Sequence, residues 1–160
     1  MPEVRGARRV DPYRGFRFRV QIPGFAESGF TKVTGLSDET ELVEYREGDG
    51  PGRMRKLPGL TKYEDVTLEK GKAADNTFQR WRNQVSQAVR DGGLPDPAFR
   101  KDVTIILLSH QNTVVKSWKL HDAWPSKLAH GDLSASSSDV LIETLTLTHE
   151  GLEALDILDR

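Results

Sequence analysis

Side chains that commonly carry chemistry are present in this sequence, but they are scattered. The four histidines, His110, His121, His130 and His149, form no His-x-His or His-x-x-x-His pair, so no local spacing favours a metal site. Ser37 lies in Gly-Leu-Ser-Asp, which lacks the flanking glycines of a nucleophile elbow. The chain has no cysteine, which excludes disulfides and a thiolate nucleophile. These residues predict no catalytic, cofactor-binding or metal site.

The other candidates for chemistry have simpler structural explanations. Carboxylates are numerous, but no spacing singles out a general acid and a general base. The glycines fall in expected loops and do not form a phosphate cradle that opens a helix. Phe78, Trp81 and Val85 recur at helical spacing, so we expect them to face a core and not a ligand. The sequence therefore predicts a protein that is not an enzyme.

Composition is that of one globular domain, which we expect to span residues 1–160. The hydrophobic fraction is 36%, and the net charge of -1 gives no general attraction for nucleic acid or anionic membrane. Arg17 and Arg19 alternate with Phe16 and Phe18 onto opposite faces, which disfavours stacking of bases where phosphates would bind. No apolar run approaches ~18 residues, and the N-terminus lacks the apolar core of a secretory signal. We therefore expect no membrane anchor, no specific nucleic-acid binding and assembly in the cytoplasm.

The elements that position these side chains are predicted to be mainly β-strands. Apolar and polar residues alternate in several segments, whereas the period changes to that of a helix over 75–91, with Asp75 as a suitable N-cap. The segment 47–59 is rich in Gly and Pro and is expected to be a long loop between strands. We predict two packed β-sheets, as a sandwich or small barrel, with one flanking α-helix. The expected strands are 14–22, 30–36, 39–46, 63–70, 101–109, 113–121 and 139–149.

Charge is arranged in blocks of alternating sign. Residues 1–19 are basic and include an N-terminal arm over 1–13, residues 38–49 are acidic, and residues 53–62 are basic again. The chain ends in an acidic tail over 154–160. Such blocks can complement one another between subunits and fix their register, or they can lie on solvated loops that keep the protein soluble. Composition alone leaves both interpretations open.

Three stretches together resemble the inner tube protein of contractile phage tails and contractile injection systems, the T4-like phage tail tube protein family. The first is FTKVTGLSDETELVEYREG at 30–48, followed by KLPGLTKY at 56–63 and VTLEKG at 66–71. The second is the expected helix with Phe78 and Trp81-Arg82, and the third is LHDAWPSKL at 120–128 with IETLTLTHEGLE at 142–153. In order and spacing, the resemblance extends from about residue 14 to residue 153.

The resemblance implies a structural protein whose six copies form a ring, with rings stacked into a hollow tube. It further implies a surrounding sheath that contracts and drives the tube through a target envelope, a baseplate with a spike, and a tube terminator. The tube would conduct cargo or DNA as part of a phage tail or of a phage-tail-like particle that is released from the cell. In such a ring, the loop 47–59 is expected to reach a neighbouring subunit or the next ring. The candidate contact residues are Arg46, Glu47, Asp49, Arg53, Arg55 and Lys56.

Other residues are candidates for the wall of the lumen. The strand 39–46 carries charge on both faces and little apolar surface, which suits a wall that water covers. The candidate lumen-facing residues are Glu41, Glu44, Thr67 and Glu69. Two other classes of function stay open: a monomeric ligand-binding β-barrel, which would need an apolar pocket, and an injected effector or enzyme, which would need a convergent catalytic or metal cluster.

Overall fold

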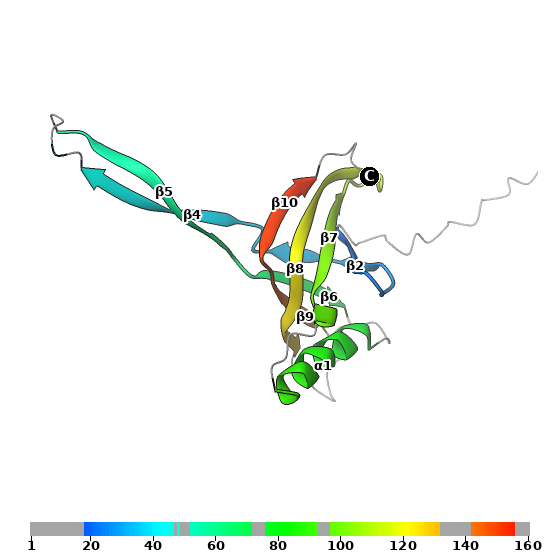
Figure 1. The fold of residues 1–160 in the computed structure, drawn as a ribbon. Helices are drawn as coiled ribbons and strands as arrows, with labels where there is room; N and C mark the ends of the chain where they lie inside the picture. Colours follow the sequence, from blue (N-terminus) through cyan, green and yellow to red (C-terminus); the bar gives the residue numbers. More distant parts are fainter. Residues whose placement is uncertain are drawn as a thin grey trace, which may run out of the picture.

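Over the residues that the structure describes, the fold consists mainly of β-strands, with one α-helix and one short 3-10 helix (Figure 1). A computed structural model describes residues 18–46, 48, 52–71, 76–92, 97–131 and 142–155. The helices are α1 (Thr77–Arg90) and η1 (Pro97–Phe99). The strands are β1 (Phe18–Gln21), β2 (Ser28–Phe30), β3 (Lys32–Thr34), β4 (Asp38–Arg46), β5 (Met54–Tyr63), β6 (Val66–Gly71), β7 (Lys101–Leu108), β8 (Val114–His130), β9 (Ile142–Thr148) and β10 (Gly151–Leu155).

Eight of these strands are connected by hydrogen-bonded pairing, seven of them along one path, and β4 and β5 form a separate two-stranded sheet. The path runs β2-β1-β7-β8-β9-β6-β3, and β10 also pairs with β8. All pairs are antiparallel. The 17-residue strand β8 pairs with β7 and β10 along its first part and with β9 along its second part. It therefore belongs to two sheets, and this confirms the expected architecture of two packed sheets with a flanking helix.

The hydrophobic core lies between the two sheets and the helix. Buried and exposed side chains alternate along these strands, because successive side chains of a β-strand point to opposite sides of the sheet. In β6 and β9, for example, Val66, Leu68, Leu145 and Leu147 are buried while the threonines between them are partly exposed. The buried core residues are Val20, Ile22, Phe30, Val66, Leu68, Phe78, Trp81, Val103, Ile105, Leu120, Ala123, Leu145 and Leu147.

Helix α1 contributes the largest buried side chain. Thr77, Phe78, Trp81 and Val85 form its buried face, as their helical spacing predicts. Trp81 is fully buried, and its Nε1–H donates a hydrogen bond of 2.7 Å to the carbonyl oxygen of Phe99 in η1. This indole thus joins the helix to the segment that leads into β7.

Replacing Trp81 by phenylalanine should lower the free energy of unfolding by about 2 kcal/mol. The substitution leaves a cavity and removes the hydrogen bond to Phe99, and each effect costs about 1 kcal/mol. Urea unfolding followed by circular dichroism measures the difference. Val89→Ala on the same helix is the matched control, because Val89 is exposed. Equal stability of W81F and the unchanged protein would contradict this role of the indole.

Several element boundaries differ from those expected. The segment 47–59 is not a loop throughout, because residues 54–59 belong to β5; of its other residues, the structure describes 48, 52 and 53, which lie outside strands. The expected strand 30–36 is divided into β2 and β3, and 113–121 is only the first part of β8. Residues 154–155 of the expected acidic tail belong to β10. The N-terminal arm 1–13, Asp75 and residues 156–160 lie outside the described residues.

Of the helices in the described ranges, none has the length and apolar character needed to cross a lipid bilayer.

Candidate assembly interface

The β4–β5 hairpin projects far from the rest of the molecule (Figure 1). Every residue of both strands is exposed, over nine residues of β4 and ten of β5. A two-stranded hairpin by itself is marginally stable in water at best, because one pair of strands buries too little surface. The hairpin therefore has the features of a surface that is completed by a partner.

The hairpin also carries most of the large apolar side chains that the described residues expose. Single exposed apolar residues are normal on a protein surface, but a continuous group of them marks an interaction site. Leu60 alone is 72% exposed. The exposed apolar residues of the hairpin are Leu42, Val43, Tyr45, Met54, Leu57, Leu60 and Tyr63.

The register of the hairpin divides its outer part into two different faces. Directly opposed residues share a face, and neighbours along a strand alternate. Val43 is opposite Leu57, and Tyr45 is opposite Arg55. We call Val43, Tyr45 and Leu57 the apolar face. The other face carries the opposed pairs Leu42–Pro58, Glu44–Lys56 and Arg46–Met54, and so is mixed in character.

The two strands of the hairpin carry opposite charge. Strand β4 contains Asp38, Glu39, Glu41 and Glu44 against Arg46, whereas β5 contains Arg55, Lys56 and Lys62 and no acid. Cross-strand pairing brings these charges together in part: the Lys62 ammonium forms an ion pair with the Glu41 carboxylate, and Lys56 lies opposite Glu44. Both side chains of the ion pair remain largely exposed, so the same charges are accessible to a partner.

The base of the hairpin is held by hydrogen bonds between residues far apart in sequence. Ser37, just before β4, donates its hydroxyl to the carboxylate of Glu64, just after β5, over 2.6 Å. The backbone N–H of Glu64 donates to the carbonyl oxygen of Ser37 over 3.3 Å. The two ends of the hairpin are thereby tied to each other where they leave the body of the molecule.

His149 ties this base to the connection between β9 and β10. The residue is 8% exposed. Its Nδ1 lies 3.0 Å from the carbonyl oxygen of Gly151, and its Nε2 lies 3.0 Å from that of Glu64. A neutral imidazole donates through one nitrogen only, whereas an imidazolium donates to both carbonyls. The Tyr63 ring packs against the imidazole, with 5.6 Å between the ring centroids.

Replacing His149 by phenylalanine should lower the free energy of unfolding by about 1–2 kcal/mol. An aromatic ring is kept, but the carbonyls of Gly151 and Glu64 lose the one N–H of a neutral imidazole or the two of an imidazolium, at roughly 1 kcal/mol for each hydrogen bond. Thermal and urea unfolding measure this change. His130→Phe is the control, since His130 is exposed at the end of β8. If both variants were as stable as the unchanged protein, His149 would not hold the hairpin base.

Four of the six residues expected at contacts between subunits are described, and they lie at the outer end of the hairpin. Arg46 ends β4, Arg53 precedes β5, and Arg55 and Lys56 lie within β5; all four are exposed. Glu47 and Asp49 lie outside the described residues. The sequence analysis did not identify the apolar face, although the alternation of Val43 and Tyr45 was visible.

The four lumen candidates do not lie on one surface. Thr67 and Glu69 share the outward face of β6, opposite to buried Val66 and Leu68. Glu44 lies on the mixed face of the hairpin. A register shift falls between Thr40 and Leu42, and a Cβ placed at Gly59 would meet both Glu41 and Val43, so Glu41 lies on the side of Val43. Glu41 and Glu44 therefore point to opposite sides of the hairpin.

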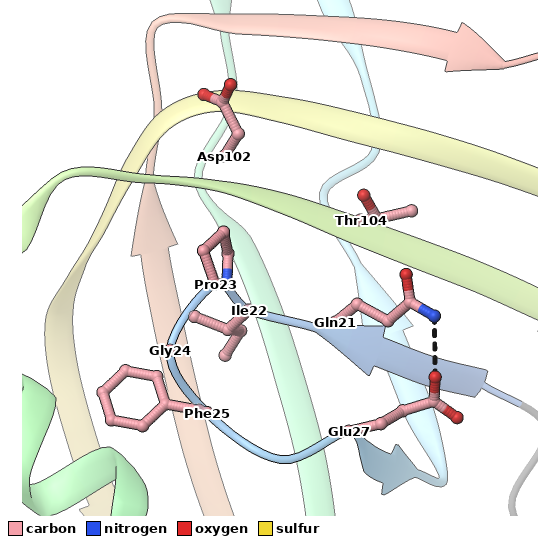
Figure 2. Close-up of a pocket in the computed structure, with 8 residues that line it drawn as sticks. All are labelled: Gln21, Ile22, Pro23, Gly24, Phe25, Glu27, Asp102 and Thr104. Carbon is pink, nitrogen blue, oxygen red and sulfur yellow. Dashed lines mark hydrogen bonds between the residues drawn. The ribbon is translucent and has the colours of Figure 1, made fainter. Parts of the chain in front are cut away.

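A hollow of about 440 Å³ lies between the β1–β2 turn and β7 (Figure 2). The side-chain amide of Gln21 donates to the Glu27 carboxylate over 2.7 Å. The Asp102 carboxylate points away from these two residues and accepts the backbone N–H of Asp122 over 3.1 Å. The side chains of Gln21, Glu27 and Asp102 are thus bonded to their neighbours and do not converge on one point. Within the described ranges, no group of three His, Asp or Glu side chains is arranged to hold a metal ion.

A two-sheet β fold with one flanking helix and a projecting hairpin is that of tail tube proteins, and comparison with known proteins identifies the family. The T4-like virus tail tube protein gp19 family matches residues 14–153. The chain belongs to this family. It is also 30% identical to the tail tube protein of Serratia phage KSP90 over 154 residues, which cover 86% of each chain.

Solved structures of similar chains agree with this assignment. A chain in the sheath–tube complex of an extracellular contractile injection system (PVC, extended state) is 26% identical, with a TM-score of 0.71 and coverage of 89% of this chain and 90% of that one. A chain in the tube-terminating cap of the anti-feeding prophage is 27% identical, with a TM-score of 0.69 and coverage of 88% of both. The protein is a tail tube protein with a structural role in a phage tail or a phage-tail-like particle.

Proposed function

We propose that six copies of this protein form a ring and that rings stack into a hollow tube, with the β4–β5 hairpin as a main contact between copies. The observation that carries the proposal is the hairpin itself, which exposes two whole strands and a set of large apolar side chains. Burial of such a surface is the main favourable contribution to most protein association. Its occupant is a second copy of the chain, because a tube consists of repeated copies.

We further propose that the tube lies inside a sheath and meets a baseplate and a terminating cap. The similar chains belong to a sheath–tube complex, a tube-terminating cap and a baseplate. The role of the protein is then mechanical and not catalytic. We also propose that the particle is assembled in the bacterial cytoplasm. Thr67, Glu69 and Glu44 are proposed to face the lumen, whereas Glu41, on the opposite side of the hairpin from Glu44, is proposed to face a neighbouring copy.

Negative-stain electron microscopy of the purified protein, together with its mass in solution, tests the ring. Rings or tubes of sixfold symmetry are expected. If the protein is monomeric alone, purified baseplate proteins are added, because they provide a surface on which the first ring can form. A protein that stays monomeric under both conditions would overturn the proposal.

Neutralising Arg53, Arg55 and Lys56 together to glutamine should weaken tube growth and leave the monomer folded. All three are exposed, so the fold does not depend on their burial. Loss of their attraction to an acidic neighbour should slow association and shorten tubes several-fold at low salt. Tube length by electron microscopy measures the effect. The control replaces Arg80, Arg90 and Lys127, which are exposed on the body of the molecule. Equal tube lengths for the two variants would contradict the prediction.

A further inference from the structure

His149 lies where the base of the hairpin meets the body of the molecule. Its Nε2 contacts the carbonyl oxygen of Glu64, the residue that closes the hairpin base with Ser37. The next residue, Glu150, donates its backbone N–H to the carbonyl oxygen of His121 in β8 over 2.9 Å. The imidazole therefore connects the hairpin base to a segment that is itself anchored on the central strand of the fold.

Both ring nitrogens of His149 face hydrogen-bond acceptors. Nδ1 and Nε2 each have a backbone carbonyl oxygen at 3.0 Å. A carbonyl oxygen only accepts, so each contact is a hydrogen bond only when the nitrogen carries a hydrogen. An imidazolium carries a hydrogen on both nitrogens, whereas a neutral imidazole carries one and directs a lone pair from the other. The protonated ring thus makes one hydrogen bond more than the neutral ring.

The two contacts of the ring differ in the length of chain that they close. The contact of Nδ1 with Gly151 spans two residues, within the connection between β9 and β10. The contact of Nε2 with Glu64 spans 85 residues and joins two separate elements. Closing a short segment costs less chain entropy than closing a long one. A ring with a single hydrogen is therefore expected to keep its contact with Gly151 and to release Glu64.

The surroundings of the ring compensate for burial of a positive charge. His149 is 8% exposed, and a buried charge is costly unless hydrogen bonds satisfy it. Hydrogen bonds from a charged donor are roughly twice as strong as those from a neutral one. The centroid of the Tyr63 ring lies 5.6 Å from that of the imidazole, within the distance of about 6 Å at which an aromatic ring attracts a cation. All three contacts are stronger for the protonated ring.

Other titratable side chains lie on the elements around His149. They are Tyr63, Glu64 and Asp65 at the β5–β6 connection, Asp38 at the start of β4, Glu150 beside His149, and His121 and Asp122 on β8. The Glu64 carboxylate accepts the Ser37 hydroxyl, and the Glu150 carboxylate pairs with Arg100. Acids predominate in this group, which is compatible with a charged ring. His121 is a second histidine close by, so an experiment must separate its effect from that of His149.

We propose that His149 is a pH-dependent link that holds the β4–β5 hairpin to the body of the molecule. With its proton, the ring donates to both Gly151 and Glu64; without it, Nδ1 keeps Gly151 and the hairpin base loses the contact at Glu64. Because the additional hydrogen bond belongs to the protonated ring, the base is held more firmly at low pH. The hold weakens as the pH rises through the range of about 5 to 8 in which histidine changes charge.

The link is a property of the single chain, and its consequence for assembly rests on the proposed ring. A hairpin that is already fixed in direction loses less conformational freedom when it contacts the next copy. The tests use the full chain below the concentration at which it assembles. Failure of the ring and failure of the link are therefore seen in different experiments.

NMR of the imidazole nitrogens tests the link in the unchanged protein. Two-dimensional ¹⁵N–¹H spectra distinguish the imidazolium from each neutral form. We expect both nitrogens of His149 to carry hydrogen at about pH 5.5 and only Nδ1 to carry hydrogen at about pH 8.0. A ring that is neutral at both pH values would overturn the proposal. So would a neutral ring with its hydrogen on Nε2, since the contact with Glu64 would then persist.

Hydrogen exchange of the Glu64 amide measures how firmly the base is held, because this N–H donates to the Ser37 carbonyl oxygen across the base. Its rate is divided by the intrinsic rate at each pH. We expect its protection to be at least about fivefold lower at about pH 8.0 than at about pH 5.5, the effect of one hydrogen bond. The amide of Thr31, which donates to the Glu69 carbonyl oxygen over 2.9 Å, is the reference and should change little.

Two variants assign the effect to the correct histidine. His149→Phe should remove the pH dependence of protection at Glu64, whereas His130→Phe should keep it, because His130 is exposed at the end of β8. A pH dependence that persists unchanged in H149F would belong to another group, such as His121, and would overturn the proposal. If H149F does not fold, the NMR spectra of the unchanged protein decide the question by themselves.

Discussion

Replacing Val43, Tyr45 and Leu57 together by serine is expected to abolish tube assembly at concentrations where the unchanged protein assembles. These side chains are 48%, 52% and 45% exposed in the single chain, so about half of each surface is left to be buried by a neighbour. Half-burial of a large apolar side chain contributes about 1 kcal/mol, and three contribute about 3 kcal/mol. The concentration needed for assembly should therefore rise roughly 100-fold.

The monomer of this variant should remain folded, because the apolar face is outside the core. Near-ultraviolet circular dichroism and urea unfolding check the fold, and sedimentation measures the concentration at which tubes form. The matched control replaces Val89, Val115 and Ile142 by serine, which removes exposed apolar surface from the body of the molecule. If the control raised the concentration needed for assembly as much as the hairpin variant, loss of exposed apolar surface anywhere on the molecule would have this effect. The hairpin would then have no special part in assembly.

The fold was predictable where one face of a strand is buried. In 139–149 and 63–70, alternation indicated the inward side of β9 and β6, and Leu68, Leu145 and Leu147 are buried as expected. Strand β5 was missed because Pro58 and Gly59 are typical of loops and because a strand with no buried face has no apolar alternation. Strand β8 was predicted too short, since its sequence passes through Asp122, whose φ of 51° is unusual for a residue other than glycine.

The candidate interface was predictable in its charges but not in its shape. Blocks of charge are visible in sequence, and Arg53, Arg55 and Lys56 indeed lie on one projecting element with Arg46. Alternation over 39–46 already places Val43 and Tyr45 on one face, but Leu57 falls in a segment that was expected to be a loop, so its position opposite Val43 was not predicted. The pairing of β4 with β5 therefore completes the apolar face, and that pairing was missed because Pro58 and Gly59 are typical of loops.

Replacing Gly35 by alanine is expected to lower the free energy of unfolding by at least about 3 kcal/mol. Gly35 lies between β3 and the base of the hairpin, with a φ of 88° that favours glycine. A Cβ at this position would lie 2.1 Å from the carbonyl oxygen of Asp65, which is backbone and cannot turn aside. The left-handed conformation costs an L-residue roughly 1–2 kcal/mol, and displacing the β5–β6 turn adds the rest.

Two other glycines separate these contributions. Gly92 has a φ of 93°, and no atom of the described residues lies within 4 Å of its Cβ position, so G92A should show the conformational cost alone, about 1 kcal/mol. Gly48 has no positive φ of this kind and no close neighbour among the residues that the structure describes, so G48A should be nearly neutral. Urea unfolding should therefore give G35A the lowest free energy of unfolding by a wide margin, G92A a higher value and G48A the highest. Because the Asp65 carbonyl adjoins the Glu64 carbonyl that His149 contacts, G35A should also disturb the hairpin base. A G35A protein as stable as G92A would mean that the β5–β6 turn yields easily, and the hairpin would then be hinged to the body and not held by it.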